Sequence, residues 1–208
     1  DVRLGTLRAM ARRGIQPQAV RNAVVEIGIG ETDIQFSWEN LYAKNKDIID
    51  SNADRFFFVP DPVRVLISGS EKVVAKAMRY PGAESRGYRE IPYEGTIYLP
   101  RADLASGANF LRLKDLFNIK VFREGDIVRG EYAGDDLQEA RSKKAPIIQW
   151  LPEKHANPCT LKTQEGDVIG VCEPEAVATK DRIVQFERVG FARIDATGNP
   201  AVAYFTHR

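Results

Sequence analysis

The chain contains 208 residues, 43% of them hydrophobic and 28% charged, and its formal net charge is +1. Its length corresponds to one or two domains at about 150 residues per domain, and its composition is that of an ordinary folded protein. The near-neutral charge excludes a strongly basic nucleic-acid-binding tail, although local basic patches are compatible with it. No apolar run approaches the ~20 residues of a membrane-spanning helix, and no secretory signal is present.

The first 50 residues carry the signals of helices. Thr6 and Ser37 are suited to cap helices because their hydroxyls can accept hydrogen bonds from free backbone N–H groups. Pro17 suits the first turn of a helix between them, which has an apolar stripe at helical spacing. Positive charge is concentrated in the first 21 residues, where five arginines and one aspartate give a local charge of +4: Arg3, Arg8, Arg12, Arg13 and Arg21 against Asp1.

The pattern changes near residue 55, where β-prone segments begin. Each segment is short and is bounded by Gly, Pro, Asn or Asp, which is typical of barrels and sandwiches rather than of alternating strands and helices. We therefore predict a helical region of about 55 residues followed by roughly 150 residues of antiparallel β structure. The predicted strands are 63–67, 73–78, 96–99, 119–122, 127–132, 147–151, 160–162, 168–172, 183–188, 191–195 and 201–205.

Residues suited to metal binding or covalent chemistry are sparse. The two cysteines, Cys159 and Cys172, do not form a CxxC pair, and the two histidines, His155 and His207, lie far apart. No metal site is predicted, because zinc needs about four such ligands at short spacing. We expect reduced thiols and a cytoplasmic location. Because the chain begins with Asp1 rather than Met, we also expect it to be processed or excised from something longer.

Sequence motifs of nucleotide-dependent and nucleophilic catalysis are missing as well. The string 28–30 (GIG) resembles the start of a dinucleotide-binding fingerprint, but no third glycine follows, and we predict a helix-ending turn there instead. Neither a GxxxxGK[ST] phosphate loop nor a GxSxG elbow occurs. A basic helical segment joined to barrel-like β domains instead favours nucleic-acid binding.

Several longer strings carry a family resemblance. In this order, and over the whole chain, they resemble the C-terminal half of a class I glutamyl-tRNA synthetase of the archaeal–eukaryotic type, a family related to glutaminyl-tRNA synthetase. The strings are RLGTLR at 3–8, RRGI at 12–15, SWENLYA at 37–43, ADRFFFV at 53–59, DPV at 61–63, RLKDLFNI at 112–119, IQW at 148–150, QFERVGF at 185–191 and FTHR at 205–208.

The resemblance implies an α+β fold that is mainly β. A helical stem-contact region would span 1–57, and two antiparallel β-barrels that bind the anticodon would follow it. The proximal barrel would be built from 58–101 together with 169–208, and the distal barrel, inserted between these segments, from 102–168. This arrangement agrees with the helix-then-strand order read from the residues.

The resemblance also implies a function. The chain would be the tRNA-binding and anticodon-recognition half of a glutamate–tRNA ligase, whose parent enzyme joins glutamate to tRNA(Glu) with ATP and Mg²⁺. The HIGH-type and KMSKS-type motifs of the ATP site do not occur here, so we expect this chain to hold no cofactor and to be inactive alone. It would position tRNA(Glu), with tRNA(Gln) as a further candidate, for the parent's catalytic domain. No membrane or DNA partner is implied.

Two alternatives to this function remain open. The chain would act as a protein–protein docking module of a synthetase complex, or it would be the same half of a glutaminyl-tRNA synthetase. The segment 104–111 argues against the second alternative. The glutaminyl relative carries a longer basic loop there, which contacts the third anticodon base, so those contacts are not carried over to this chain.

Site residues follow from the same resemblance. It assigns anticodon contacts to Arg55, Arg112 and Gln185, and Lys114 is expected on the same strand face as Arg112. A guanidinium can donate two parallel hydrogen bonds to a base edge, and an amide offers a donor and an acceptor together. These residues are therefore our candidates for reading the anticodon.

Further residues receive predicted roles. The cationic heads of Arg8, Arg12 and Arg13 would face phosphates on the inner side of the tRNA and make binding salt-dependent. Glu187 and Arg188 are predicted to form an ion pair with each other. Trp150 is left open between a core position and a base-stacking platform. Other aromatic residues are predicted to be core: Trp38, Tyr42 and 56–58.

Overall fold

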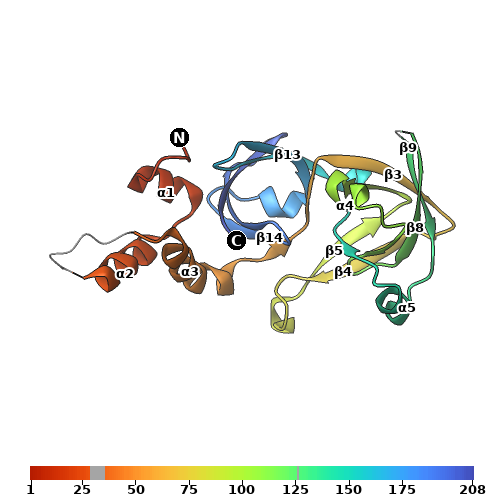
Figure 1. Ribbon diagram of the computed structural model, residues 1–208, viewed down its shortest axis with the longest axis horizontal. Helices are drawn as coiled ribbons and strands as arrows, with labels where there is room; N and C mark the ends of the chain where they lie inside the picture. The colour runs from red at the N-terminus through yellow and green to blue at the C-terminus, as the bar shows by residue number, and fades with distance from the viewer. Residues whose placement is uncertain (29–35, 126) are drawn as a thin grey trace.

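A computed structural model describes residues 1–28, 36–125 and 127–208. Within them the chain forms an elongated molecule, with helices at one end, a first β-barrel in the middle and a second β-barrel at the other end (Figure 1). Both termini lie on the side of the helices and the first barrel, so the chain runs out to the second barrel and returns. Ile29 and Gly30 of the GIG string lie outside the described residues.

The helical signals of the N-terminal region are confirmed. Helices α1 (Leu7–Arg13), α2 (Pro17–Ile27) and α3 (Trp38–Ile49) form, and a short 3₁₀ turn, η1 (Asp50–Asn52), extends the last of them. The hydroxyl of Thr6 accepts from the backbone of Ala9, and that of Ser37 accepts from the backbone of Asn40. Gly14 ends α1 at a φ of 92°, which favours glycine.

The first barrel is a seven-stranded sheet in the described part of the chain, with the order β1-β14-β15-β16-β12-β13-β2. Its two edge strands, β1 and β2, are separated in sequence only by Phe57, so the sheet has to curl until its ends meet. Its strands are β1 (Arg55–Phe56), β2 (Phe58–Pro60), β12 (Asn157–Lys162), β13 (Asp167–Cys172), β14 (Ile183–Phe186), β15 (Gly190–Ala196) and β16 (Ala201–His207).

The second barrel closes by the same device. Its described strands follow the order β10-β7-β8-β9-β3-β6-β11, and only Gln149 and Trp150 separate the edge strands β10 and β11. A hairpin of β4 (Val73–Met78) and β5 (Tyr88–Tyr93) packs against this barrel. The barrel strands are β3 (Pro62–Ser68), β6 (Thr96–Pro100), β7 (Phe110–Leu113), β8 (Asn118–Glu124), β9 (Ile127–Tyr132), β10 (Ile147–Ile148) and β11 (Leu151–Pro152).

Short helical elements connect the strands. Helix α4 precedes β7 and α5 follows β9, while the 3₁₀ turn η2 lies at the tip of the β4–β5 hairpin. Their bounds are α4 (Arg101–Ala105), α5 (Leu137–Ser142), η2 (Glu84–Arg86), η3 (Glu153–His155) and η4 (Pro174–Val177).

Strand pairing divides the chain differently from the expected boundaries. Strands β3 and β6 lie in 58–101, which was assigned to the proximal barrel, yet they belong to the second barrel because β3 pairs in parallel with β9. Strand β12 lies in 102–168 but pairs in parallel with β16 in the first barrel. These pairings join segments that are far apart in the chain. Because they are parallel, the barrels are mostly but not entirely antiparallel.

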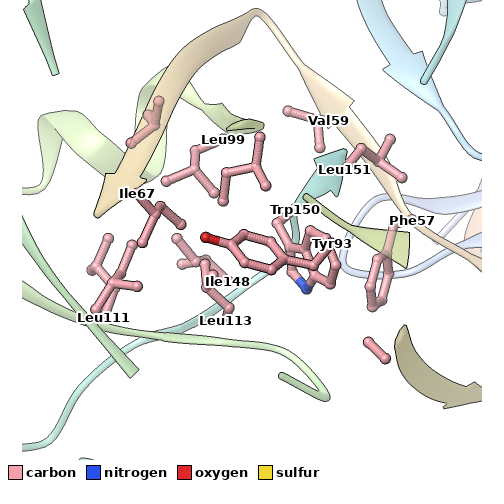
Figure 2. Packing of buried hydrophobic residues seen from close by; sticks show 14 of the residues in the cluster. Phe57, Val59, Ile67, Tyr93, Leu99, Leu111, Leu113, Ile148, Trp150 and Leu151 are labelled. Carbon is pink, nitrogen blue, oxygen red and sulfur yellow. The ribbon is translucent and has the colours of Figure 1, made fainter. Parts of the chain in front are cut away.

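Each barrel encloses its own apolar core. In the second barrel, Trp150 is fully buried beside Tyr93, with ring centroids 6.1 Å apart in an edge-to-face arrangement (Figure 2). Its indole N–H donates to the carbonyl of Lys114 at 2.9 Å, which satisfies its polar atom inside the barrel. Trp150 is therefore a core residue and not a stacking platform.

The run Phe56-Phe57-Phe58 supplies both cores, since successive side chains of an extended chain point in opposite directions. Phe56 and Phe58 are buried in the first barrel, whereas Phe57 is buried in the core of the second, in the same cluster as Trp150 (Figure 2). The prediction that these residues are core is confirmed. The run also joins the two barrels.

Closure of the first barrel depends on Gly170 of β13, which pairs with β2. A Cβ added there would lie 2.6 Å from Phe58 Cζ and 2.6 Å from the carbonyl oxygen of Val59. We expect Gly170→Ala to lower the free energy of unfolding by about 1–3 kcal/mol, the usual effect of overpacking. Urea denaturation checks this, with Gly5→Ala as the control, because a Cβ there meets only the Trp38 ring at 3.5 Å. Equal effects of the two variants would contradict it.

Candidate nucleic-acid interface

The strand register brings two predicted site residues together. Arg55 of β1 and Gln185 of β14 are direct partners in the parallel pairing of these strands. The backbone holds both in place, because the N–H of Arg55 donates to the carbonyl of Arg79 at 2.8 Å and that of Gln185 donates to the carbonyl of Asp54 at 2.9 Å. Neither residue is fully buried. The two side chains are therefore neighbours on β1 and β14, at one end of the strand order of the first barrel.

Each of these side chains has a buried polar atom with no partner among the described residues. They are Nε of Arg55, a donor, and Oε1 of Gln185, an acceptor. Leaving such an atom without a hydrogen bond costs about 1–3 kcal/mol. The register thus places a donor and an acceptor without partners on neighbouring side chains, with both atoms enclosed by the protein.

Lys114 connects this pair to the second barrel. It directly follows β7, and its Nζ lies 2.9 Å from Oε2 of Glu187 and 5.7 Å from the centre of the Phe57 ring. Glu187 is only two residues beyond Gln185. The side chain of Lys114 is 31% exposed, and its Nζ also lies 3.3 Å from Oδ2 of Asp115.

Arg112 lies two residues before Lys114. The burial of β7 alternates, with Leu111 and Leu113 fully buried and Arg112 partly exposed, as the sequence predicts. Nη1 of Arg112 donates to the carbonyl of Asp135 at 2.8 Å and to Oδ1 of Asn118 at 3.3 Å. These bonds fix the guanidinium at the rim of the second barrel.

A buried ionic cluster beneath these residues was not predicted. Arg89 of β5 is 2% exposed and forms ion pairs with Glu173 and, at 2.8 Å, with Glu187, while its guanidinium lies 4.6 Å from the centre of the Phe57 ring. Burial raises the pKa of Glu173 to about 7, and the charge of Arg89 acts in the opposite direction. The strand alternation that places Arg89 on the same face as Ile91 and Tyr93 is the signal that would have revealed it.

The predicted ion pair between Glu187 and Arg188 is wrong. Glu187 pairs instead with Arg89 and Lys114. Arg188 adopts a positive φ of 62°, which turns it away, and it forms a bidentate pair with Asp103 at 2.8 Å for both bonds. The two neighbours thus contact different elements.

The three arginines of α1 have different surroundings. Arg8 is exposed and has no ion-pair partner within the described ranges, and Arg12 is exposed, with Nη2 3.4 Å from Asp195 and the guanidinium 4.8 Å from the Tyr204 ring centre. Arg13 is 1% exposed and donates to the carbonyl of Thr206 at 2.6 Å. The predicted phosphate contact of Arg13 is therefore corrected: this arginine joins α1 to β16. Arg8 and Arg12 are four residues apart and therefore share one face of α1, whereas Arg13 lies on a different face. This spacing is the sequence signal that could have distinguished Arg13 from the other two.

Among the described residues, no helix is long and apolar enough to cross a membrane, and no three His, Cys, Asp or Glu side chains are grouped so as to hold a metal ion. Cys159 and Cys172 are both buried and form no disulfide.

Comparison with known proteins agrees with this arrangement. Two family models, both described as the anti-codon binding domain of class I tRNA synthetases (E and Q), match residues 53–133 and 147–195. The chain therefore belongs to the anticodon-binding domains of the class I synthetases for glutamate and glutamine.

The similar curated proteins are more specific. A glutamate–tRNA ligase of Methanospirillum hungatei is 86% identical over 208 residues, and those of Methanoculleus marisnigri and Methanocorpusculum labreanum are 57% and 55% identical over 209 residues. All of this chain is covered in each comparison, but it spans only 37% of the length of each relative.

The contact between the helices and β16, where Arg13 and His207 are buried, also makes stability depend on pH. His207 is 2% exposed, stacks on Tyr42, and accepts at Nε2 from the amide of Asn45 at 2.9 Å. Burial, the main cause, lowers the pKa of His207 from its usual 6.5, so the unfolded chain takes up the proton more readily. We expect the free energy of unfolding to decline as the pH falls below about 6.5.

Urea denaturation of the wild type and of His207→Gln at about pH 8 and about pH 5 checks this. Groups other than His207 contribute equally to the pH dependence of both proteins, so the difference between them isolates His207. His207→Gln should flatten the decline, and His155→Gln, which changes the exposed histidine, should leave it intact. The same decline in His207→Gln as in the wild type would show that His207 is not its source.

Proposed function

We propose that this chain is the tRNA-binding and anticodon-reading part of a glutamate–tRNA ligase. It binds tRNA(Glu) in the cytoplasm and orients it toward a catalytic domain in the rest of a longer protein, where glutamate would be joined to tRNA with ATP and Mg²⁺. The observation that carries the proposal is the register pairing of Arg55 with Gln185, two partly exposed side chains that each keep a polar atom without a hydrogen bond.

The chemistry of this pair matches an unstacked base. The Watson–Crick edge of uracil offers a carbonyl acceptor next to an N–H donor, so the guanidinium of Arg55 can donate to the first while the amide of Gln185 accepts from the second. Sequence-specific RNA readers bind splayed loop bases in this way. A site with unpaired buried polar groups also rejects a base that cannot satisfy them, which gives selectivity.

The positions of the remaining cations support a long RNA ligand. Lys114 contacts Glu187, two residues beyond Gln185, and Arg112 lies two residues before Lys114 on β7 of the second barrel. Arg8 and Arg12 belong to α1, at the helical end of the elongated molecule (Figure 1). In the proposed complex the first group flanks the anticodon and the second binds backbone phosphates nearer the acceptor arm. Phosphate contacts of this kind add affinity without sequence information.

Glutamate is favoured over glutamine as the amino acid of the parent enzyme. The similar proteins named above are glutamate–tRNA ligases, whereas the family models cover both specificities. The short segment at 104–111 points the same way. We keep tRNA(Gln) as a further ligand to be tested beside tRNA(Glu).

Titration with a tRNA(Glu) transcript tests the proposal, in parallel with a transcript whose middle anticodon uridine is replaced by cytidine. We expect micromolar or tighter binding of tRNA(Glu), and Gln185→Ala should weaken it about tenfold while hardly changing binding of the substituted transcript. Gln138→Ala, an exposed glutamine on α5, serves as the control. No binding at low salt would refute the proposed function, and equal losses on both transcripts would place Gln185 outside the base contact.

The salt dependence of the same titration tests the role of α1. Arg8→Ala should reduce the slope of log affinity against log salt by about one and should weaken both transcripts alike. Arg3→Ala is the matched control, because the Arg3 guanidinium is already neutralised by Asp1, with Nε 3.0 Å from Oδ1. An unchanged slope in Arg8→Ala would mean that Arg8 binds no phosphate.

A further inference from the structure

The side chain of Arg55 is held by a residue from a different element. Tyr80 directly follows Arg79, whose carbonyl accepts from the backbone of Arg55, and lies in the loop between β4 and β5. The guanidinium carbon of Arg55 is 4.9 Å from the centre of the Tyr80 ring. Such a cation–π contact leaves the N–H groups in the guanidinium plane available for other partners.

Asp50 completes a corner around Arg55. Its Oδ2 accepts from the Tyr80 hydroxyl at 2.6 Å, and its Oδ1 accepts from Nη2 of Arg55 at 3.4 Å. The two carboxylate oxygens therefore tie the ring and the guanidinium to each other. The hydrogen bond to Asp50 is also the main cause of the raised pKa of Tyr80.

Tyr80 is itself fixed from the helical side. The guanidinium of Arg86 lies 5.1 Å from the centre of the Tyr80 ring, and its Nη2 donates to the carbonyl of Asn52 at 3.2 Å and also pairs with Asp54. Asn52 belongs to η1, and Asp54 is the residue before Arg55. The tip of the β4–β5 hairpin, which belongs to the second barrel, is thereby anchored beside the strand that carries Arg55.

The result is an arginine whose guanidinium has one face covered and one end bonded, while its Nε is buried without a partner. Nη2 is bound by Asp50, the ring of Tyr80 covers the guanidinium, and Nε has no partner and lies on the residue in register with Gln185. An arginine side chain otherwise has many rotamers, so its orientation has to be fixed before binding if it is to discriminate between bases.

We propose that Tyr80 is a positioning residue for base recognition, which acts through Arg55 by holding its guanidinium in one orientation beside Gln185. This inference rests on the proposed function, because it presupposes that Arg55 reads an anticodon base. Tyr80 contributes to discrimination between bases and not to general RNA affinity.

Binding of the tRNA(Glu) transcript and of the transcript with cytidine at the middle anticodon position tests this. The measured quantity is the ratio of the two affinities. Tyr80→Leu should lower this ratio about tenfold, within the range seen for coupled neighbours. Tyr80→Phe, which keeps the ring and loses the bond to Asp50, should lower it about threefold. Tyr88→Leu, an exposed tyrosine 44% accessible on the same hairpin, should leave it unchanged.

A double-mutant comparison separates positioning from direct contact. Arg55→Ala alone should lower the affinity ratio at least as much as Tyr80→Leu does. Arg55→Ala combined with Tyr80→Leu should lose no more than Arg55→Ala alone, since both changes remove the same contact. Additive losses would show that Tyr80 contacts RNA by itself and would overturn the inference. Unchanged thermal unfolding of Tyr80→Leu establishes that the fold is intact.

The two proposals fail in different ways. If Arg55→Ala removes the discrimination and Tyr80→Leu does not, the positioning role is wrong while the proposed function stands. If the wild-type chain does not bind the tRNA(Glu) transcript, or binds both transcripts equally, the proposed function itself fails. A loss in Tyr80→Leu that is equal for both transcripts would reduce Tyr80 to a structural residue and would also overturn the inference.

Discussion

The alternation of side chains along Phe56-Phe57-Phe58 is the constraint on which the rest of the molecule depends. Phe56 and Phe58 enter the core of the first barrel and Phe57 enters the core of the second, so one extended segment belongs to both cores. The backbone N–H of Phe57 donates to Oε1 of Glu173 at 2.6 Å, which satisfies it between the two barrels. Rotation of one barrel against the other would have to pull an aromatic ring out of a packed core.

The same constraint explains why an ionic cluster lies beneath the candidate site. Arg89 stacks on Phe57 and forms ion pairs with Glu173 and Glu187. Glu187 also forms an ion pair with Lys114 of the second barrel. A buried arginine is tolerated only when its charge is paired, and here the partners come from the first barrel while Arg89 comes from the hairpin. The cluster thus fixes the geometry between Gln185 and Lys114, which lie on different barrels.

The sequence correctly predicted those features of the fold that depend on interactions between residues close together in the chain. Caps at Thr6 and Ser37 and the alternation around Arg112 depend on neighbours within a few residues, and the structure has them. The division into barrels failed because β3 pairs with β9 and β12 with β16, contacts between distant segments that no local pattern encodes. The resemblance predicted Arg55 and Gln185 singly, but their register and the contacts of Tyr80, on which its proposed role rests, required the tertiary structure. Arg13 was misassigned because a basic composition does not show which side of a short helix is covered.

The near-zero net charge acquires a physical meaning from these contacts. Several arginines near Arg55 form ion pairs within the protein: Arg79, Arg86 and Arg182 all pair with Asp54 or Glu175. Their charge is therefore cancelled locally and adds little to attraction of RNA in general. Other cations, such as Arg8, form no ion pair within the described ranges and keep their charge for phosphates. In the proposed complex, attraction to RNA in general would rise with each such free cation, whereas contacts to base edges would supply the difference between one base and another.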